Sequence, residues 1–368
     1  MGDSLTTHLS VLDARVSLSA PAEILGPIAF AYRRFRVERP DGTERRVELD
    51  GAGIRIDDQV VPLVPGLDRT SQFYQRFLQT LMDGLGSHLL LHAAALADGR
   101  GRATLLAAPS GHGKTSLTLE LLGRGMRFLG DDYAPLDPEA RTVHPYPRAV
   151  GLVPDPAKPI PDRFRRIALA PDAVRLLGKS LVDVGQALGD PVLVTRPAAL
   201  RSVILLTADE SEATNATTWL EAAARVEVAD RIEADLRAID GVELVSRRSE
   251  PHLRAWKLRV SHDRFPTGKL AAILDRDAVI VSAKVWTTQP DFAGPPRAVP
   301  VKRREAAEWL GREMLNRRDG GRLLARYRGS IAAMFFDLAR ALSNVECYRV
   351  RVGGCRETAD LVCELLND

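Results

Sequence analysis

Apolar and polar residues alternate along much of the first 65 residues. The stretches VLDARVSLSA, FRVERPDG, TERRVELDG and AGIRIDDQVVPLV show this alternation, with turn pairs such as Asp41-Gly42 and Asp50-Gly51. Period-two alternation is typical of strands with one buried face, and Asp-Gly favours tight turns. We therefore predict a strand-rich segment over 1–86 that ends in a helix from about Ser71 to Leu85.

The pattern then changes to continuous apolar runs. LLLHAAALA (89–97) and ATLLAAPS (103–110) flank the polar turn DGRGR, which is typical of strands buried on both faces. A helix is predicted from Thr115 to about Leu122, followed by the strand MRFLG (126–130). A strand, a glycine loop, a helix and a second strand form the skeleton of an α/β nucleotide-binding unit.

The rest of the chain divides into three further parts. LRSVILLTA (200–208) is a buried strand that completes a core over 87–211. Residues 212–292 combine strand patterns with helical ones, including a helix at 267–274, and predict a small α+β insertion. Residues 293–368 predict two amphipathic helices (about 302–318 and 321–342), the strand CYRVRVG and a final helix ETADLVCELL, which together complete the core.

The strongest chemical signal is APSGHGKTS at 108–116. It matches the phosphate-binding pattern of glycine, four residues and Gly-Lys-Ser/Thr, except that Ala108 replaces the first glycine. Backbone N–H groups at a helix N-terminus attract phosphate, the lysine neutralises phosphate oxygens, and the threonine hydroxyl suits Mg²⁺. We expect nucleotide binding by Ser110, Gly111, His112, Gly113, Lys114, Thr115 and Ser116. We expect the side chain of His112 to point outward.

A second signal is the pair Asp131-Asp132, 17 and 18 residues after Lys114. Only one helix and one short strand intervene, so we expect an adjacent parallel strand to place both carboxylates beside the phosphate loop. One can hold Mg²⁺ while the other accepts a proton from an incoming hydroxyl. By itself, an Asp-Asp pair at a strand end would more often be a turn or a helix cap.

A third element is His92, inside the apolar run LLLHAAALA. A lone histidine in such a run is often a satisfied core residue. At the end of a strand beside Asp132 it would instead hydrogen-bond the acceptor or tune the base.

These residues resemble the bacterial HPr kinase/phosphorylase family, and more closely the looser group of HPr kinase-related proteins. The resemblance rests on His92, PSGHGKTS and LELLGRGMRFLGDDY, and covers residues 88–148. It implies an α/β fold with the P-loop core shared by HPr kinases and ATP-dependent phosphoenolpyruvate carboxykinases. The family carries Glu where this chain has Ser116, and no segment for engaging the HPr protein is recognisable here.

The resemblance also implies roles for individual residues. Lys114 and Thr115 would bind phosphate and magnesium, and Asp131 would support the metal. Asp132 would be the general base, with His92 and Lys114 completing the catalytic set. Arg148 is a candidate phosphate ligand within PRAVGL (147–152), although a surface arginine is an equally good interpretation.

Composition limits the partners and the location. The balance of 51 basic and 48 acidic residues, net +3, does not indicate a nucleic-acid partner. Three cysteines without a CxxC pair, the lack of a signal-peptide pattern and the lack of a long apolar stretch favour a cytoplasmic protein that does not enter a membrane. The sequence carries no reliable signal for an oligomer.

The leading hypothesis is a kinase that uses ATP and Mg²⁺ to phosphorylate a hydroxyl group. The acceptor would be a peptide or protein Ser or a small hydroxylated molecule. One alternative is a bifunctional kinase/phosphorylase acting on an HPr-like protein. Another is a non-catalytic, nucleotide-gated binding module, against which the second carboxylate of the Asp131-Asp132 pair counts.

Overall fold

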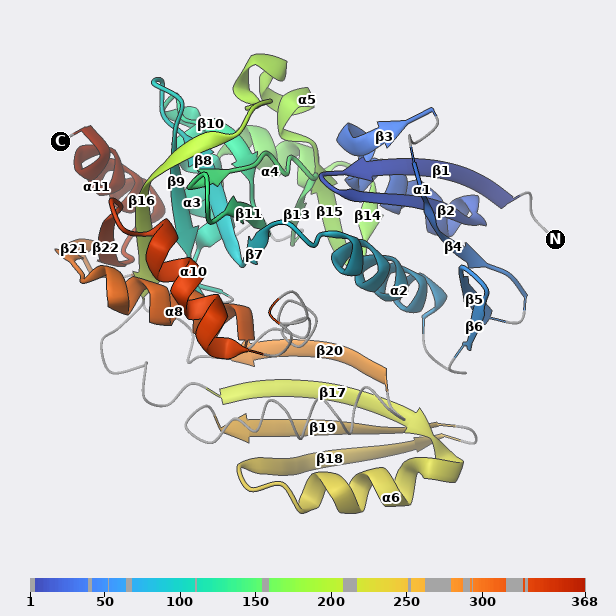
Figure 1. Ribbon diagram of the computed structural model, residues 1–368. Helices are drawn as coiled ribbons and strands as arrows, with labels where there is room; N and C mark the ends of the chain where they lie inside the picture. Colours follow the sequence, from blue (N-terminus) through green and yellow to red (C-terminus); the bar gives the residue numbers. More distant parts are fainter. Residues whose placement is uncertain are drawn as a thin grey trace.

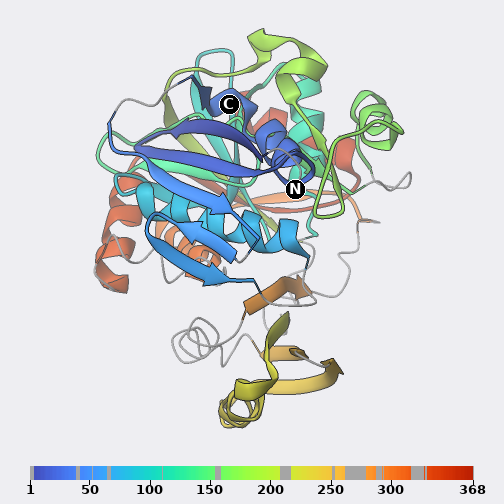
Figure 2. The same ribbon diagram turned by 90° about the vertical axis from the view of Figure 1, so that its right-hand side faces the viewer.

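The computed structural model shows a mixed α/β chain built on four sheets. It describes residues 4–38, 42–51, 53–63, 68–109, 111–153, 159–207, 217–250, 253–261, 279–286, 292, 294–315, 327 and 330–367. Figure 1 shows the N-terminal sheet beside the central sheet, and Figure 2 shows it in front of the central sheet; in both views a smaller sheet projects from the same molecule. Within this part of the chain, none of the helices combines the length and the apolar character needed to cross a membrane.

The N-terminal segment forms a six-stranded sheet in the order β3-β1-β2-β4-β5-β6. Its helix α2 begins after Asp68, whose carboxylate accepts a hydrogen bond from the Ser71 N–H, as an N-cap should. Phe73, Phe77 and Leu81 on α2 are fully buried against the sheet. The elements are β1 Ser4–Val11, β2 Ala14–Pro21, α1 Ala22–Ala31, β3 Arg36–Val37, β4 Arg45–Leu49, β5 Gly53–Ile56, β6 Gln59–Pro62 and α2 Arg69–Gly84.

The central sheet has the order β10-β8-β9-β16-β12-β11-β7, and β22 pairs with β16 and β21. Strand β16 runs parallel to both β9 and β22, whereas β8 runs antiparallel to β9 and to β10. Its strands are β7 Leu89–Leu91, β8 Ala93–Ala97, β9 Arg102–Ala107, β10 Arg127–Gly130, β11 Ala134–Asp137, β12 Thr142–Val143, β16 Ala198–Thr207, β21 Arg297–Pro300 and β22 Glu346–Arg351.

Helices cover both faces of the central sheet, which explains its continuous apolar runs. Alternate residues such as Leu105 and Val203 pack with helices α8 and α10, while their neighbours Leu106 and Ile204 pack with α3 and α11. These helices are α3 Lys114–Gly123, α8 Arg303–Leu315, α10 Ile331–Ala341 and α11 Cys355–Asn367. The core of the molecule therefore lies on both sides of the strand that leads into the phosphate loop.

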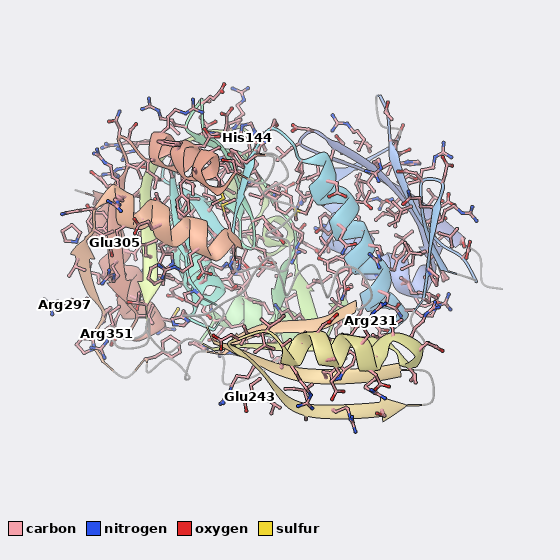
Figure 3. The ribbon with its side chains drawn as sticks, turned by 60° about the horizontal axis from the view of Figure 1, so that its bottom comes forward. His144, Arg231, Glu243, Arg297, Glu305 and Arg351 are labelled. Atoms are coloured by element: carbon pink, nitrogen blue, oxygen red, sulfur yellow. The ribbon has the colours of Figure 1, made fainter. Side chains whose placement is uncertain are left out.

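Two smaller sheets complete the chain. A three-stranded sheet, β13-β15-β14, lies between the N-terminal and central parts, and a four-stranded sheet, β18-β19-β17-β20, has its own core with α6 around Trp256. Figure 3 labels Arg231 on α6 and Glu243 on β18 in this second unit, away from Glu305 and Arg351. The elements are β13 Val150–Leu152, α4 Asp162–Leu169, β14 Arg175–Leu176, β15 Lys179–Val182, α5 Val184–Leu188, β17 Thr217–Arg225, α6 Val226–Arg237, β18 Val242–Glu250, β19 Leu253–Ser261 and β20 Val279–Trp286.

Several elements differ from those predicted. Helix α1 and strand β17 were not expected, because neither stretch has a clear amphipathic period; α1 even contains Pro27. Strand β10 is not adjacent to β9, since β8 lies between them. The helix expected over 267–274 lies outside the described residues, as does most of 321–330. The division into four parts at 1–86, 87–211, 212–292 and 293–368 stays a prediction.

Asp183 joins the N-terminal segment to the rest of the chain. It is 4% exposed, caps α5, and accepts hydrogen bonds from Arg33 Nε at 2.6 Å and from Arg34 Nε and Nη2 at 2.9 and 2.8 Å. Burial by itself would raise the pKa of Asp183, but the bonds from Arg34, the Gln186 N–H and Arg33 lower it. The carboxylate is therefore held in its charged form by residues from two distant parts of the sequence.

We expect Asp183→Ala to lower the free energy of unfolding by about 2–3 kcal/mol, because it leaves two arginines without their shared anion. Asp162, which pairs with Arg165 and is 79% exposed at its side chain, is the matched control. Asp162→Ala should change stability by less than about 0.5 kcal/mol. Urea denaturation at pH 7 measures both, and equal losses would show that the Asp183 cluster is not a structural joint.

Candidate active site

The segment between β9 and α3 has the backbone of a phosphate-binding loop. Gly111 and Gly113 adopt φ angles of +91° and +76°, a left-handed conformation that residues with a Cβ rarely take. Gly113 is the N-cap of α3, and the helix begins at Lys114. The N–H groups of the first helical turn therefore face the loop, where an anion is favoured. Ser110 lies outside the described residues.

Sheet topology brings the predicted acidic pair and the histidine to this loop. In the register of β8, Ala93 lies opposite Ala107 of β9, and Ala95 lies opposite Gly130 of β10. Because β8 is antiparallel to both neighbours, its beginning lies at the same edge as their ends. His92 precedes β8, the phosphate loop follows β9, and Asp131-Asp132 follow β10. The three predicted elements therefore share one edge of the sheet.

Asp131 is bonded to the phosphate loop itself. Its Oδ2 accepts a hydrogen bond of 2.9 Å from Thr115 Oγ1. The residue is 7% exposed, and its buried Oδ1 has no hydrogen-bond partner among the described residues. Burial, and then the neighbouring charge of Asp132, raise the pKa of Asp131 to about 6. A buried carboxylate oxygen without a donor is a group that a cation would satisfy.

Lys114 and His92 are in direct contact. Lys114 is 8% exposed, and its Nζ lies 2.9 Å from His92 Nε2. Because an ammonium group can only donate, Nε2 must be the acceptor and the imidazole proton belongs on Nδ1. That nitrogen lies 3.8 Å from Glu313 Oε2 on α8. The structure thus adds Glu313 to the site, a residue with no local sequence signal.

Arg148 contacts the second carboxylate. Its Nη2 donates to Asp132 Oδ2 at 2.6 Å and its Nη1 donates to the Tyr74 hydroxyl at 2.9 Å. The guanidinium also lies over the Tyr32 ring, 5.8 Å from its centroid. Burial by itself would lower the pKa of Arg148, but Tyr74 and Asp132 raise it well above its ordinary value. Arg148 is therefore a permanent cation that contacts Asp132 and is largely buried, unlike the surface arginine that the sequence allowed, while its role as a phosphate ligand stays a prediction.

Two other loop residues face inward. Ser116 is 8% exposed and His112 is 3% exposed, and both line a small cavity beside the loop. The prediction that the His112 side chain points outward is therefore wrong. The physical reason is that the chain near Phe292 and Val352 covers the loop on that side, a long-range contact that no local pattern shows.

The groups present fit a magnesium ion better than a transition metal. Mg²⁺ is commonly held by one or two protein oxygens together with phosphate oxygens and water. Thr115 Oγ1 and the unpartnered Oδ1 of Asp131 are such oxygens. Among the described residues, no cluster of three or more His, Cys, Asp and Glu side chains could hold a metal.

Comparisons with known proteins add little to this geometry. The chain matches no known family model and none of the curated proteins. Among solved structures it is similar to the Hpr(Ser) kinase/phosphatase from Coxiella burnetii, with 20% identity over 32% of this chain and a TM-score of 0.21. The match spans 65% of that chain, just under two thirds of its length. A likeness at this TM-score carries no argument for fold or function.

The raised pKa of Asp131 has a measurable consequence for stability. Because its folded pKa of about 6 lies above the ordinary value of 3.8, its contribution to stability is full below about pH 4 and is lost as the pH rises through 6. Without added metal, Asp131→Asn should therefore stabilise the protein at pH 8 by about 2–3 kcal/mol, and the gain should vanish towards pH 4.

Asp137 serves as the control, because its pKa is shifted in the direction opposite to that of Asp131. Hydrogen bonds from the backbone N–H of Ala140, and then of Glu139, lower the pKa of Asp137 despite its partial burial. Asp137→Asn should thus destabilise the protein at pH 8 and lose its effect on acidification. Urea denaturation between pH 4 and pH 8 compares the two. A loss of stability in Asp131→Asn at pH 8 would contradict the buried, uncompensated carboxylate.

Proposed function

We propose that this chain is an ATP-dependent kinase that uses Mg²⁺ and transfers the γ-phosphoryl group to a hydroxyl. One observation carries the proposal. A phosphate-loop lysine, a threonine bonded to a buried carboxylate, and a second carboxylate oriented by an arginine meet at one edge of the sheet. Phosphoryl transfer needs mainly positioning and charge neutralisation, which such a set of groups supplies.

Each side chain has a distinct part in the proposed reaction. The backbone N–H groups of 111–116 and the Lys114 ammonium bind the β- and γ-phosphates, so Lys114 exchanges His92 for phosphate oxygens when nucleotide binds. Thr115 and Asp131 would hold Mg²⁺, which neutralises phosphate charge. ATP and Mg²⁺ are thus the proposed cosubstrate and cofactor.

Asp132 is the proposed general base. The acceptor oxygen attacks the γ-phosphorus, its proton passes to the Asp132 carboxylate, and the bond from the γ-phosphorus to the bridging oxygen breaks to release ADP. Arg148 holds one carboxylate oxygen of Asp132 at 2.6 Å and so fixes its direction. Holding a base in one orientation removes a large part of the entropic barrier to proton transfer.

The acceptor is proposed to be a peptide or protein Ser or a small hydroxylated molecule. The residues that orient Asp132 connect it to Tyr74 on α2 and to Tyr32 just after α1. The N-terminal segment therefore lies next to the base, and we propose that it shapes the acceptor site together with the 212–292 segment. A more specific version of this proposal is a bifunctional kinase/phosphorylase, which phosphorylates an HPr-like protein and also removes that phosphate by phosphorolysis.

One observation favours a second candidate, a nucleotide-gated binding module. The ion pair between Arg148 and Asp132 is short and partly buried, with side-chain exposures of 15% and 34%. A carboxylate already engaged by an arginine can serve as a structural switch instead of a base. The module would bind ATP by the same loop but would transfer no phosphate.

Two substitutions distinguish these functions. Lys114→Ala should weaken ATP binding by about tenfold to hundredfold, because a charge-assisted contact to phosphate is lost. Asp132→Asn should leave binding nearly intact and lower transfer by about 10²- to 10⁴-fold. The measurements are ATP affinity by calorimetry and transfer of γ-labelled phosphate from Mg-ATP into a lysate of the native host. Full transfer by Asp132→Asn would overturn the base assignment, and tight ATP binding without any labelled product would establish the binding module.

Arg148 provides a further test, because the two interpretations of this residue predict different results. If it orients Asp132, Arg148→Gln should lower transfer about a hundredfold and keep ATP affinity within about twofold of wild type. Tyr74→Phe is the matched control, because it removes one hydroxyl from the same network and keeps the ring. A parallel loss of ATP affinity in Arg148→Gln would instead identify a phosphate ligand.

A further inference from the structure

A small cavity of about 120 Å³ opens beside the phosphate loop, and most of its lining comes from residues outside the loop that have no part in the chemistry proposed above. It is bounded by the loop, by the first turn of α3 and by the chain that follows β22. Its lining is mostly apolar and includes His112, Leu117, Phe292, Val352, Gly354 and Thr358. The Thr358 hydroxyl, one of its few polar groups, already accepts a hydrogen bond of 3.0 Å from the Gly353 N–H.

The order of strands places this cavity on the opposite side of the loop from the two carboxylates. Strands β8 and β10, which lead to His92 and Asp131-Asp132, lie on one side of β9, whereas β16 and β22 lie on the other. Because β9, β16 and β22 are parallel, their carboxyl ends meet at the edge where the loop begins. Ligands of open α/β sheets bind in crevices of this kind, outside the carboxyl ends of the strands.

This arrangement determines in which direction the three phosphates of a bound nucleotide would run across the loop. If the γ-phosphate faces Asp132 and the β-phosphate lies in the loop, the rest of the molecule has to leave on the side of Ser116 and Leu117. The cavity begins at these two residues. A flat, largely apolar group attached to the α-phosphate would therefore enter it directly.

The aromatic wall of the cavity is set by close backbone packing. A Cβ on Gly353 would lie 2.4 Å from the Gly294 carbonyl oxygen, so a glycine is needed for the 294–296 segment to approach the end of β22. This approach brings Phe292 over the loop. Its Cε1 lies 3.7 Å from the point where a Cβ would be if Gly113 carried a side chain. Phe292 is 36% exposed, so part of its ring is accessible to a ligand.

We propose that this cavity holds the base of a nucleoside triphosphate, with the ring of Phe292 as its stacking partner and Leu117 and Val352 as its apolar floor. The inference rests on the proposed function and deepens it, because it names the residues that would recognise the base of ATP and so distinguish ATP from an inorganic polyphosphate. Stacking on an aromatic ring accepts any base, because every base has a π-face. It therefore selects nucleotides as a class and does not distinguish one base from another.

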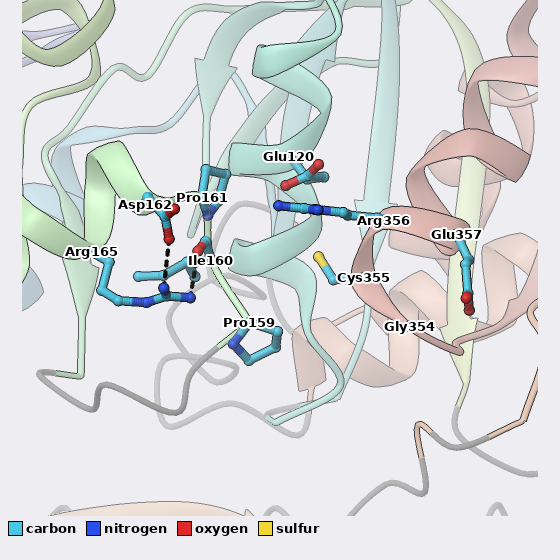
Figure 4. Close-up of a pocket in the computed structure, with 10 residues that line it drawn as sticks. All are labelled: Glu120, Pro159, Ile160, Pro161, Asp162, Arg165, Gly354, Cys355, Arg356 and Glu357. Carbon is cyan, nitrogen blue, oxygen red and sulfur yellow. Dashed lines mark hydrogen bonds and ion pairs between the residues drawn. The ribbon is translucent and has the colours of Figure 1, made fainter.

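A wider cleft continues outward from the cavity. It has a volume of about 310 Å³ and shares Pro159, Gly354 and Cys355 with the cavity. Figure 4 shows its far side, where Arg165 is bonded to Asp162 and to the Ile160 carbonyl, opposite the beginning of α11. The charged side chains along this cleft can meet the polar outer edge of a base held in the apolar cavity.

The test compares ATP with inorganic tripolyphosphate, which has the same phosphates and no base. Calorimetry on the full chain with Mg²⁺ measures both affinities for the wild type, Phe292→Ala and Phe292→Trp. We expect Phe292→Ala to weaken ATP binding about tenfold and to leave tripolyphosphate binding within about twofold, while Phe292→Trp retains ATP affinity. Phe336→Ala, at a 76% exposed phenylalanine on α10, is the matched control and should change neither affinity.

The possible failures are separable. If the wild type binds ATP and Phe292→Ala changes nothing, or weakens both ligands equally, the base site is wrong and the proposed kinase stands. If tripolyphosphate binds the wild type as tightly as ATP does, no base is recognised and the inference also fails. If the wild type binds neither ligand, both the proposed function and this inference are overturned.

Discussion

The antiparallel pairing of β8 with both β9 and β10 is the constraint on which the candidate site depends. A strand that runs against both of its neighbours has its first residue at the edge where theirs end. The registers of Ala93 with Ala107 and of Ala95 with Gly130 thereby bring His92, the phosphate loop and the two aspartates to one place. A slip of one residue in either pairing would turn every buried side chain of β8 to the other face, so the apolar packing on both faces maintains this geometry.

The site at this edge of the sheet contains two carboxylates and two cations that are buried or partly buried. Asp131 and Asp132 are neighbours in sequence, and the charge of each disfavours the charge of the other. Lys114 and Arg148 supply the opposing charges, but neither of them donates a hydrogen bond to Asp131 Oδ1. Such a cluster costs stability in the protein alone and becomes favourable when a cation and an anionic ligand complete it. Under the proposed function, a bound metal and phosphate would offset this cost.

The sheet also separates two tasks in space. The carboxylates that would act on the acceptor lie on the β8–β10 side of the phosphate loop, and the apolar cavity lies on the β16–β22 side. Among the described residues, the N-terminal segment reaches the first of these through the contacts of Tyr74 and Tyr32 with Arg148. The part of the chain that resembles no nucleotide-binding pattern therefore contacts the side of the carboxylates, where the proposed kinase would have to recognise its acceptor.

The sequence by itself determined the local features of this protein. Two continuous apolar runs, the motif at 108–116 and the spacing to Asp131-Asp132 were enough to predict strand, loop, helix and strand in the right order, because their signals are local in the chain. The sequence did not show that β8 lies between β9 and β10, that Arg148 contacts Asp132 instead of solvent, or that Glu313 and Phe292 lie near the loop. Only the tertiary structure decided these points, because each depends on contacts between residues far apart in sequence, and side-chain periodicity carries no information about which distant strands pair or which helices cover them.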